Sequence, residues 1–200
     1  MQSAVAVPAP PTFPIRPMTL AEYQQLIAMG FFGPEERLEF IQGYVHPMTP
    51  KGPHHKYGLR RLTQRFYECA GQAVVIQVQD SILLPASGSQ PEPDLAMLWP
   101  AADDYADRHP EPADVLLVAE VADSSLEFDR DTKAALYAAA ALPDYWLLNL
   151  VDRCLTVHRD PVTLPDGAAE YQTIFSVQSG QSVALLHLPD CTVEVASLLP

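Results

Sequence analysis

The hydrophobic and polar positions along the chain predict alternating helices and strands. A capping box at Thr19–Glu22 predicts a short helix that runs to about Gly30. Apolar residues at helical spacing predict further helices over 54–70 and about 130–141. The predicted strands are a hairpin over 38–46 around the Gln42-Gly43 turn, then 74–79, 81–84, 93–99, 115–121, 145–150, 154–159, 171–177, 182–186 and 192–195. This order predicts an α+β (mixed α/β) domain with one central sheet flanked by helices.

Two of these strands, 93–99 and 115–121, are apolar at alternating and at intervening positions, which is typical of strands covered on both faces. Each carries one acid, Asp94 in the first and Glu120 in the second. If the strands are antiparallel neighbours with Trp99 opposite Val115, Asp94 falls opposite Glu120 on the same face. Like charges so placed repel, and an unpaired buried carboxylate costs several kcal/mol. A divalent metal between the two acids is the simplest remedy, so the pattern predicts a metal site.

Length and composition favour one domain with an N-terminal extension. Two hundred residues suffice for a sizeable core. Residues 1–17 hold five prolines and predict an extended arm, which leaves 18–200 as the domain. The net charge of −13 disfavours a broad surface that coats DNA, because phosphate binding draws on clustered Lys and Arg. It is compatible with a small, metal-loaded cleft that handles phosphodiesters locally.

The cysteines and the N-terminus predict a cytoplasmic protein. Cys69, Cys154 and Cys191 include no CxxC pair, and three scattered cysteines favour buried, reduced thiols. The N-terminus has neither a basic region nor a long apolar run, so we expect no signal peptide and no membrane span.

Lys133 is the third candidate for the chemistry. It shares a helical face with Leu136, Tyr137 and Ala140, and we expect that face to pack on the sheet. From the first turn of its helix, the lysine can extend past the core and place its ammonium near the carboxylates. An ammonium beside acids and a metal suits phosphoryl chemistry, where negative charge develops in the transition state. The alternative is a solvent-facing lysine that stabilises its own helix beside Asp129.

Four further residues are weaker candidates. Glu39, an acid in the first hairpin, would complete the shell around a metal, or it pairs only with Arg37. His55 can contact a phosphate or a metal, although histidines before helices more often satisfy a backbone group. Arg60 and Arg61 form the best candidate patch for phosphate contacts, and the alternative is the solvated side of their helix.

Several short stretches match one known pattern in the same order along the chain. They are 37–43 (RLEFIQG), 47–50 (PMTP) with His55, 91–95 (PEPDL), 118–125 (VAEVADSS), Asp129, Lys133, Tyr137 and 143–147 (PDYWL). With this set, which covers about residues 18–160, the chain resembles the Uma2 family of restriction-endonuclease-like proteins in the PD-(D/E)XK nuclease superfamily. The ordered set is far more specific than any one of its parts.

The resemblance implies a restriction-endonuclease-like fold and a magnesium site. Asp94 and Glu120 would bind the ion together with the Val121 carbonyl, and Glu39 would be an accessory acid. The chain departs from the superfamily pattern at Ala122, where the lysine is normally found. The Uma2 pattern uses a lysine on the next helix instead, which is Lys133 here.

The leading hypothesis is therefore a Mg²⁺- or Mn²⁺-dependent endonuclease that hydrolyses DNA phosphodiesters. Hard oxygen ligands favour either ion over zinc. We expect a homodimer, since duplex cleavage needs two sites. An RNA substrate or a structured DNA intermediate is a further possibility. The alternative from another class is a non-catalytic binding or assembly module that retains the fold, and it predicts that Lys133 points to solvent.

Overall fold

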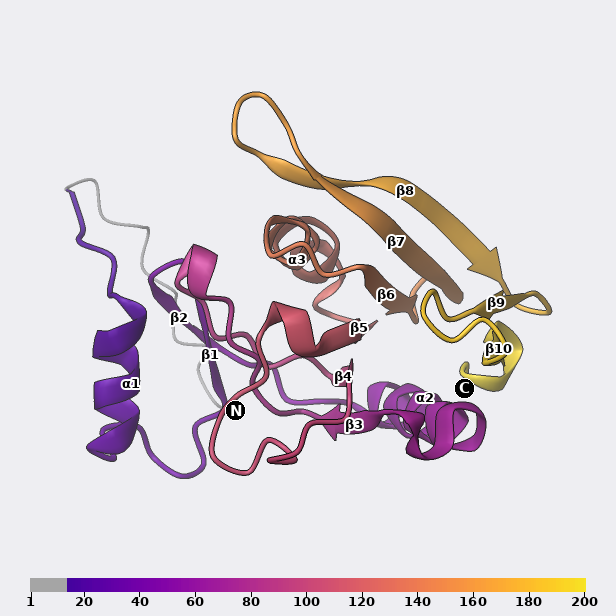
Figure 1. The fold of residues 1–200 in the computed structure, drawn as a ribbon, viewed down its shortest axis with the longest axis horizontal. Helices are drawn as coiled ribbons and strands as arrows, with labels where there is room; N and C mark the ends of the chain where they lie inside the picture. Colours follow the sequence, from indigo (N-terminus) through magenta and orange to yellow (C-terminus); the bar gives the residue numbers. More distant parts are fainter. Residues whose placement is uncertain (1–13) are drawn as a thin grey trace, which may run out of the picture.

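A six-stranded mixed sheet forms the centre of the molecule in the computed structural model, which describes residues 14–200 (Figure 1). The strand order is β3-β4-β5-β6-β7-β8, with β5 and β6 parallel and every other neighbouring pair antiparallel. These strands are β3 (Val75–Val78), β4 (Leu95–Leu98), β5 (Val115–Ala122), β6 (Asp144–Asn149), β7 (Cys154–Thr163) and β8 (Ala169–Gln178). The predicted mixed α/β architecture with one central sheet is confirmed.

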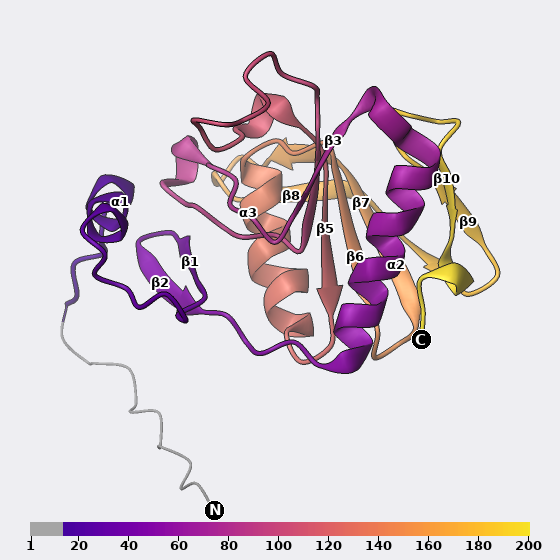
Figure 2. The same ribbon diagram turned by 90° about the horizontal axis from the view of Figure 1, so that it is seen from below.

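Three α-helices and two small hairpins surround this sheet. The helices are α1 (Leu20–Ala28), α2 (Pro53–Ala70) and α3 (Ala134–Ala139), and the hairpins pair β1 (Leu38–Ile41) with β2 (Tyr44–Pro47) and β9 (Ser182–Ala184) with β10 (Thr192–Glu194). Figure 2 shows α2 and α3 on opposite faces of the sheet. The β1–β2 hairpin lies beside the sheet, next to α1.

The central strand β5 shows why both faces must be covered. All eight of its residues are buried. Ala119 and Val121 belong to the core on the α2 side, and Val118 and Ala122 belong to the core on the α3 side. Apolar residues on both faces of the strand therefore predicted correctly that both faces are covered. A different helix shields each face of β5 from solvent.

The predicted register of β4 and β5 is right at the acidic end and wrong at the other end. Leu95 pairs with Ala119, and the preceding residue, Asp94, donates its backbone N–H to Oε2 of Glu120 at 3.1 Å. At the far end, however, Leu98 pairs with Val115, so Trp99 does not. A β-bulge adds one residue on β5 between these points and shifts the pairing by one.

One other local prediction is wrong, and one is right about the helix but not about the type of its first turn. Residues 81–84 form no strand but only one isolated bridge from Leu84 to Ser89. Ile82 and Leu84 pack into the core on the α3 side, so their apolar pattern reflects burial and not a sheet ladder. The helix predicted over 130–141 begins with a six-residue π-helical turn, η4 (Phe128–Lys133), before α3.

The prediction of three reduced thiols is also wrong. Cys69, near the end of α2, and Cys191, before β10, form a disulfide with a Cα–Cα distance of 5.0 Å. They are 122 residues apart in the sequence, so only the fold brings them together. Cys154 is free and buried. The argument from reduced thiols to the cytosol is thereby lost.

The predicted arm over 1–17 falls mostly outside the described residues, which begin at 14. Residues 14–17 are exposed and belong to no helix or strand. Across residues 14–200, no helix combines the length and apolar character that crossing a membrane would need.

Candidate active site

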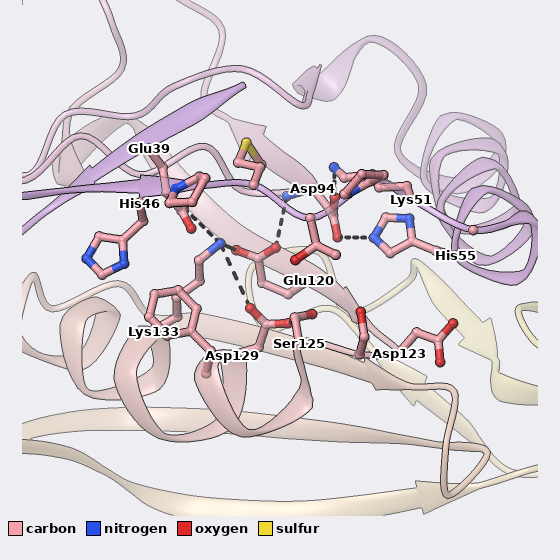
Figure 3. A pocket seen from close by; sticks show the side chains of 17 residues that line it. Glu39, His46, Lys51, His55, Asp94, Glu120, Asp123, Ser125, Asp129 and Lys133 are labelled. Carbon is pink, nitrogen blue, oxygen red and sulfur yellow. Dashed lines mark hydrogen bonds and ion pairs between the residues drawn. The ribbon is translucent and has the colours of Figure 1, made fainter. Parts of the chain in front are cut away.

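A pocket of about 320 Å³ opens where β4 begins and β5 ends (Figure 3). The β1–β2 hairpin and residues 48–52 form one wall, and residues 123–129 with Lys133 form the other. The pocket is lined by Glu39, His55, Asp94, Glu120 and Lys133, five of the residues singled out in the sequence.

Asp94 is buried and all of its carboxylate oxygens have partners. Oδ2 accepts a hydrogen bond from the Val121 N–H at 2.9 Å and contacts Nε2 of His55 at 2.8 Å. Oδ1 lies 2.5 Å from Nζ of Lys51 and accepts a longer bond, 3.3 Å, from Gln79. Burial by itself would raise the pKa of Asp94, but the hydrogen bond to His55 and the charge of Lys51 hold this pKa well below its ordinary value. The carboxylate is therefore ionised.

Glu120 lies on the other side of the pocket floor. The positive charge around it is too small to balance the cost of burying an ionised carboxylate. Its Oε1 accepts hydrogen bonds from Nζ of Lys133 at 2.9 Å and from the Tyr137 hydroxyl at 2.8 Å. Burial raises the pKa of Glu120 to about 8, since Lys133 only partly offsets burial and the nearby carboxylates of Asp129 and Asp94 oppose ionisation. A further cation at this point would favour the carboxylate form.

Lys133 points into the acidic cluster and not to solvent. Only 4% of the residue is exposed. Its Nζ lies 2.9 Å from Oε1 of Glu120, 3.0 Å from Oε2 of Glu39 and 3.9 Å from Oδ1 of Asp129. Burial lowers the pKa of Lys133, but the three carboxylates outweigh burial and raise it above the ordinary value. Of the two orientations that the sequence left open, the structure has the inward one.

Asp129 and Lys133 reach the pocket together from the π-helical turn η4. Ala134 donates its N–H to the carbonyl of Asp129, five residues earlier, so this turn is wider than an α-helical turn. Asp129 and Lys133 are both buried on it, and Ser125 donates its hydroxyl to Oδ2 of Asp129 at 2.5 Å. Single π-turns of this kind are frequent at functional sites.

Glu39 contacts the cluster from the first hairpin. Its Oε2 lies 3.0 Å from Nζ of Lys133 and accepts a long hydrogen bond, 3.5 Å, from the N–H of Glu92. Arg37, the alternative partner that the sequence suggested for Glu39, forms its ion pair with Glu92 instead.

The remaining predicted residues divide between the pocket and the surface. His55 is buried in the pocket wall against Asp94, and its Nδ1 has no hydrogen-bond partner within residues 14–200. Arg60 and Arg61 lie outside the pocket. Arg60 is stacked over the Tyr57 ring, 5.5 Å from its centroid, and Arg61 donates to the carbonyl of Ser197 at 2.9 Å.

Three residues of this site were not among the predicted site residues. Lys51 contacts Asp94, Asp129 approaches Lys133, and the Tyr137 hydroxyl donates to Glu120. Asp129 had a signal in the sequence, since it lies four residues before Lys133, and Tyr137 stands in the matched pattern but was expected only in the core. Lys51 is one of only three lysines, yet nothing in its neighbourhood distinguishes it from a loop lysine.

A divalent ion fits this site by charge and chemistry more than by ready-made geometry. Four buried carboxylates, Glu39, Asp94, Glu120 and Asp129, face two ammonium groups, Lys51 and Lys133, so two negative charges are unbalanced when all four are ionised (4 − 2). Hard oxygen donors of this kind suit Mg²⁺ or Mn²⁺. Among residues 14–200, however, no three His, Cys, Asp or Glu side chains already surround one point as a metal-binding group. A metal would therefore have to replace contacts that the acids now make with lysines.

Comparison with known proteins agrees with this fold. The structure is similar to the crystal structure of a putative nuclease belonging to DUF820 from Anabaena variabilis ATCC 29413, with a TM-score of 0.70 and 12% sequence identity over 91% of this chain and 97% of that one. At this identity the likeness shows the fold alone. Among curated proteins, no match is found. The family model of Uma2, described as putative restriction endonuclease, matches residues 20–196, which is nearly the whole chain. The chain therefore belongs to the Uma2 family, the nuclease-type family that the ordered motifs indicated.

Proposed function

We propose that this protein is a metal-dependent endonuclease that hydrolyses phosphodiester bonds of DNA. The observation that carries the proposal is the convergence of Asp94, Glu120 and Lys133 in one pocket, with each side chain buried and hydrogen-bonded. Family membership gives independent support for nuclease-type chemistry.

Asp94 and Glu120 would hold Mg²⁺ or Mn²⁺ together with the Val121 carbonyl. The bound ion would supply Lewis acidity and lower the pKa of a bound water. The Val121 N–H and His55 already orient Oδ2 of Asp94, while Oδ1 contacts Lys51 and Gln79. Tyr137 orients Oε1 of Glu120 in the same way from the helix side.

Lys133 would stabilise negative charge on the reacting phosphate or orient the attacking water. Its ammonium is held by Glu120 and Glu39 and stays protonated, since these carboxylates raise its pKa. A charge fixed before the reaction costs little reorganisation when the transition state forms. Lys133 would take the role of the lysine that the superfamily pattern has at the position of Ala122.

Two observations favour the alternative, a non-catalytic binding module that retains the fold. The net charge is −13, and Arg60 and Arg61 lie outside the pocket. The inward Lys133 favours the enzyme, because a module with no chemistry has no need for a buried lysine among four acids. Cleavage of both strands by one site each would further require two copies of the chain.

The experiment is titration calorimetry of Mg²⁺ and Mn²⁺ into wild type, Asp94→Ala and Asp107→Ala, with plasmid nicking measured on the same samples. Asp107 is exposed, so Asp107→Ala makes the same charge change away from the pocket. We expect metal binding and nicking to vanish only in Asp94→Ala. Binding without nicking would turn the search to RNA, and no binding by wild type at millimolar metal would contradict the metal site.

A further inference from the structure

Lys51 is a charged contact of Asp94 that the proposed chemistry leaves without a role. It lies in residues 48–52, which join β2 to α2 and form neither helix nor strand. Only 11% of its side chain is exposed, and its Nζ lies 2.5 Å from Oδ1 of Asp94. Two of the three lysines of the chain are thus turned into the same acidic pocket.

The two lysines are held very differently. Lys133 comes from a helical turn and its Nζ lies within 4 Å of three carboxylates, Glu120, Glu39 and Asp129. Lys51 comes from a connecting segment and pairs with Asp94 alone. In Figure 3, Lys51 and His55 lie on the Asp94 side of the pocket, and Lys133 lies on the Glu120 side. Lys133 is part of a network, whereas Lys51 makes one contact that can be exchanged.

The oxygen that Lys51 contacts is also the one that a metal would use. Oδ2 of Asp94 is already taken by the Val121 N–H at 2.9 Å and by His55 at 2.8 Å. Oδ1 has only Lys51 and the 3.3 Å bond from Gln79. An ammonium and a divalent cation on the same carboxylate oxygen would repel each other strongly in a buried site, so the two compete for Oδ1.

We propose that Lys51 is a positioning residue that takes the place of the metal at Oδ1 of Asp94 in the metal-free protein and leaves it when Mg²⁺ or Mn²⁺ binds. This inference rests on the metal site of the proposed function. While the metal is absent, Lys51 keeps Asp94 ionised and in place, which avoids an unpaired buried carboxylate. Metal binding is then an exchange of one cation for another. The affinity of the site for the metal is therefore lower than it would be without Lys51.

The test is titration calorimetry of Mn²⁺ into wild type, Lys51→Met, Lys51→Arg and Lys56→Met. Lys56 is exposed on α2 and makes no ion pair among the described residues, so Lys56→Met is matched in charge and chemistry. We expect Lys51→Met to bind Mn²⁺ about tenfold more tightly than wild type, because the competing charge is gone. Lys51→Arg keeps the charge and should stay within about threefold of wild type, as should Lys56→Met.

A second readout separates competition from a merely structural role. Without metal, Lys51→Met should melt below wild type, since Asp94 loses a partner, and saturating Mn²⁺ should raise its melting temperature more than that of wild type. If Lys51→Met does not fold, Lys51→Gln takes its place with the same expectation.

The outcomes distinguish this inference from the proposed function. If wild type binds Mn²⁺ and Lys51→Met binds equally or more weakly, the inference about Lys51 is overturned and the metal site stands. If neither protein binds Mn²⁺ at millimolar concentration, the metal site itself is wrong and the inference fails with it. Binding by Lys51→Met alone would support competition in its strongest form.

Discussion

Two regions of this protein bury a carboxylate in the central sheet, and only one of them has the features of a site. Asp144, at the start of β6, accepts bonds from Arg159 at 2.9 and 3.1 Å, from the Trp146 indole at 2.9 Å and from the Leu186 N–H at 3.1 Å. The cavity at Asp144 measures only about 10 Å³, against about 320 Å³ beside Asp94 and Glu120. At most one water fits there.

The charge balance separates the two regions as clearly as the space does. At Asp144 one acid faces one guanidinium, and every oxygen has a donor. In the pocket four acids face two lysines, and burial together with neighbouring acids raises the pKa of Glu120 to about 8. A buried acid thus indicates function when acids outnumber cations beside open space, and indicates architecture when it is fully paired in a closed one.

The largest effect is expected from Glu120→Gln, which tests the functional side of this comparison. We expect plasmid nicking to fall at least about a hundredfold, since a neutral amide is a poor metal ligand and a poor charge partner for Lys133. Stability should change far less than nicking, because burial and the neighbouring carboxylates already disfavour the charged form of Glu120 in the folded protein. Nicking rates and thermal melting on the same sample measure both. Retained nicking would remove Glu120 from the proposed site.

Asp144→Asn tests the architectural side. The substitution leaves the Arg159 guanidinium partly buried without its counter-charge, which should cost about 3 kcal/mol of unfolding free energy. Nicking per folded molecule should stay at the wild-type level. Urea denaturation measures the first quantity, with Asp107→Ala as the surface control. A large loss of nicking in folded Asp144→Asn would show that the two regions are coupled.

Added metal should stabilise the protein only through the pocket, so the gain should depend on Asp94 and not on Asp144. At a Mg²⁺ concentration ten times the dissociation constant, wild type should gain about 1.4 kcal/mol of unfolding free energy, and removal by EDTA should reverse the gain. Asp144→Asn should gain the same amount and Asp94→Ala none. Equal stabilisation of Asp94→Ala would mean that the ion binds elsewhere.

The smallest effect is expected from pH, at a histidine buried among tyrosine side chains. His158 is packed between Tyr145 and Tyr171, with ring centroids 5.0 and 5.7 Å away, and burial lowers its pKa below 6.5. A depressed histidine pKa means that the unfolded chain binds the proton first, so stability falls as the pH drops below about 6.5. His158→Phe should reduce this loss by about 1 kcal/mol at pH 5. Urea denaturation of both proteins at pH 5 and pH 7.5 would measure this difference. An equal loss of unfolding free energy in wild type and His158→Phe would contradict the prediction.

Local patterns predicted correctly where several of these residues lie in the fold. The two-sided apolar strands placed Asp94 beside Glu120, since a strand register depends on alternation and on the residues that pair. Helical spacing put Lys133 on the face of its helix that packs on the sheet. The bulge near Leu98 and the π-turn over 128–133 were not predicted, because a single extra residue or a wider turn leaves no periodic trace.

Contacts between distant segments account for what the sequence did not reveal. Lys51 meets Asp94 from 43 residues away, and Cys69 meets Cys191 from 122 residues away. Arg60 and Arg61 have the composition of a phosphate patch and still lie outside the pocket, since the packing of α2 turns them elsewhere.

By itself the sequence determined the elements, the two-sided burial of the central strands and the presence of acids that need a cation there. These follow from short-range periodicity and from the cost of burying charge. Both can be recognised from residues that are close together in the sequence. Only the tertiary structure decided which cations answer those acids: Lys133 with Glu39 on one side of the pocket, Lys51 on the other and Arg159 at Asp144. Ion pairs form between whatever groups the packing brings within a few ångströms, and that proximity belongs to the folded chain as a whole.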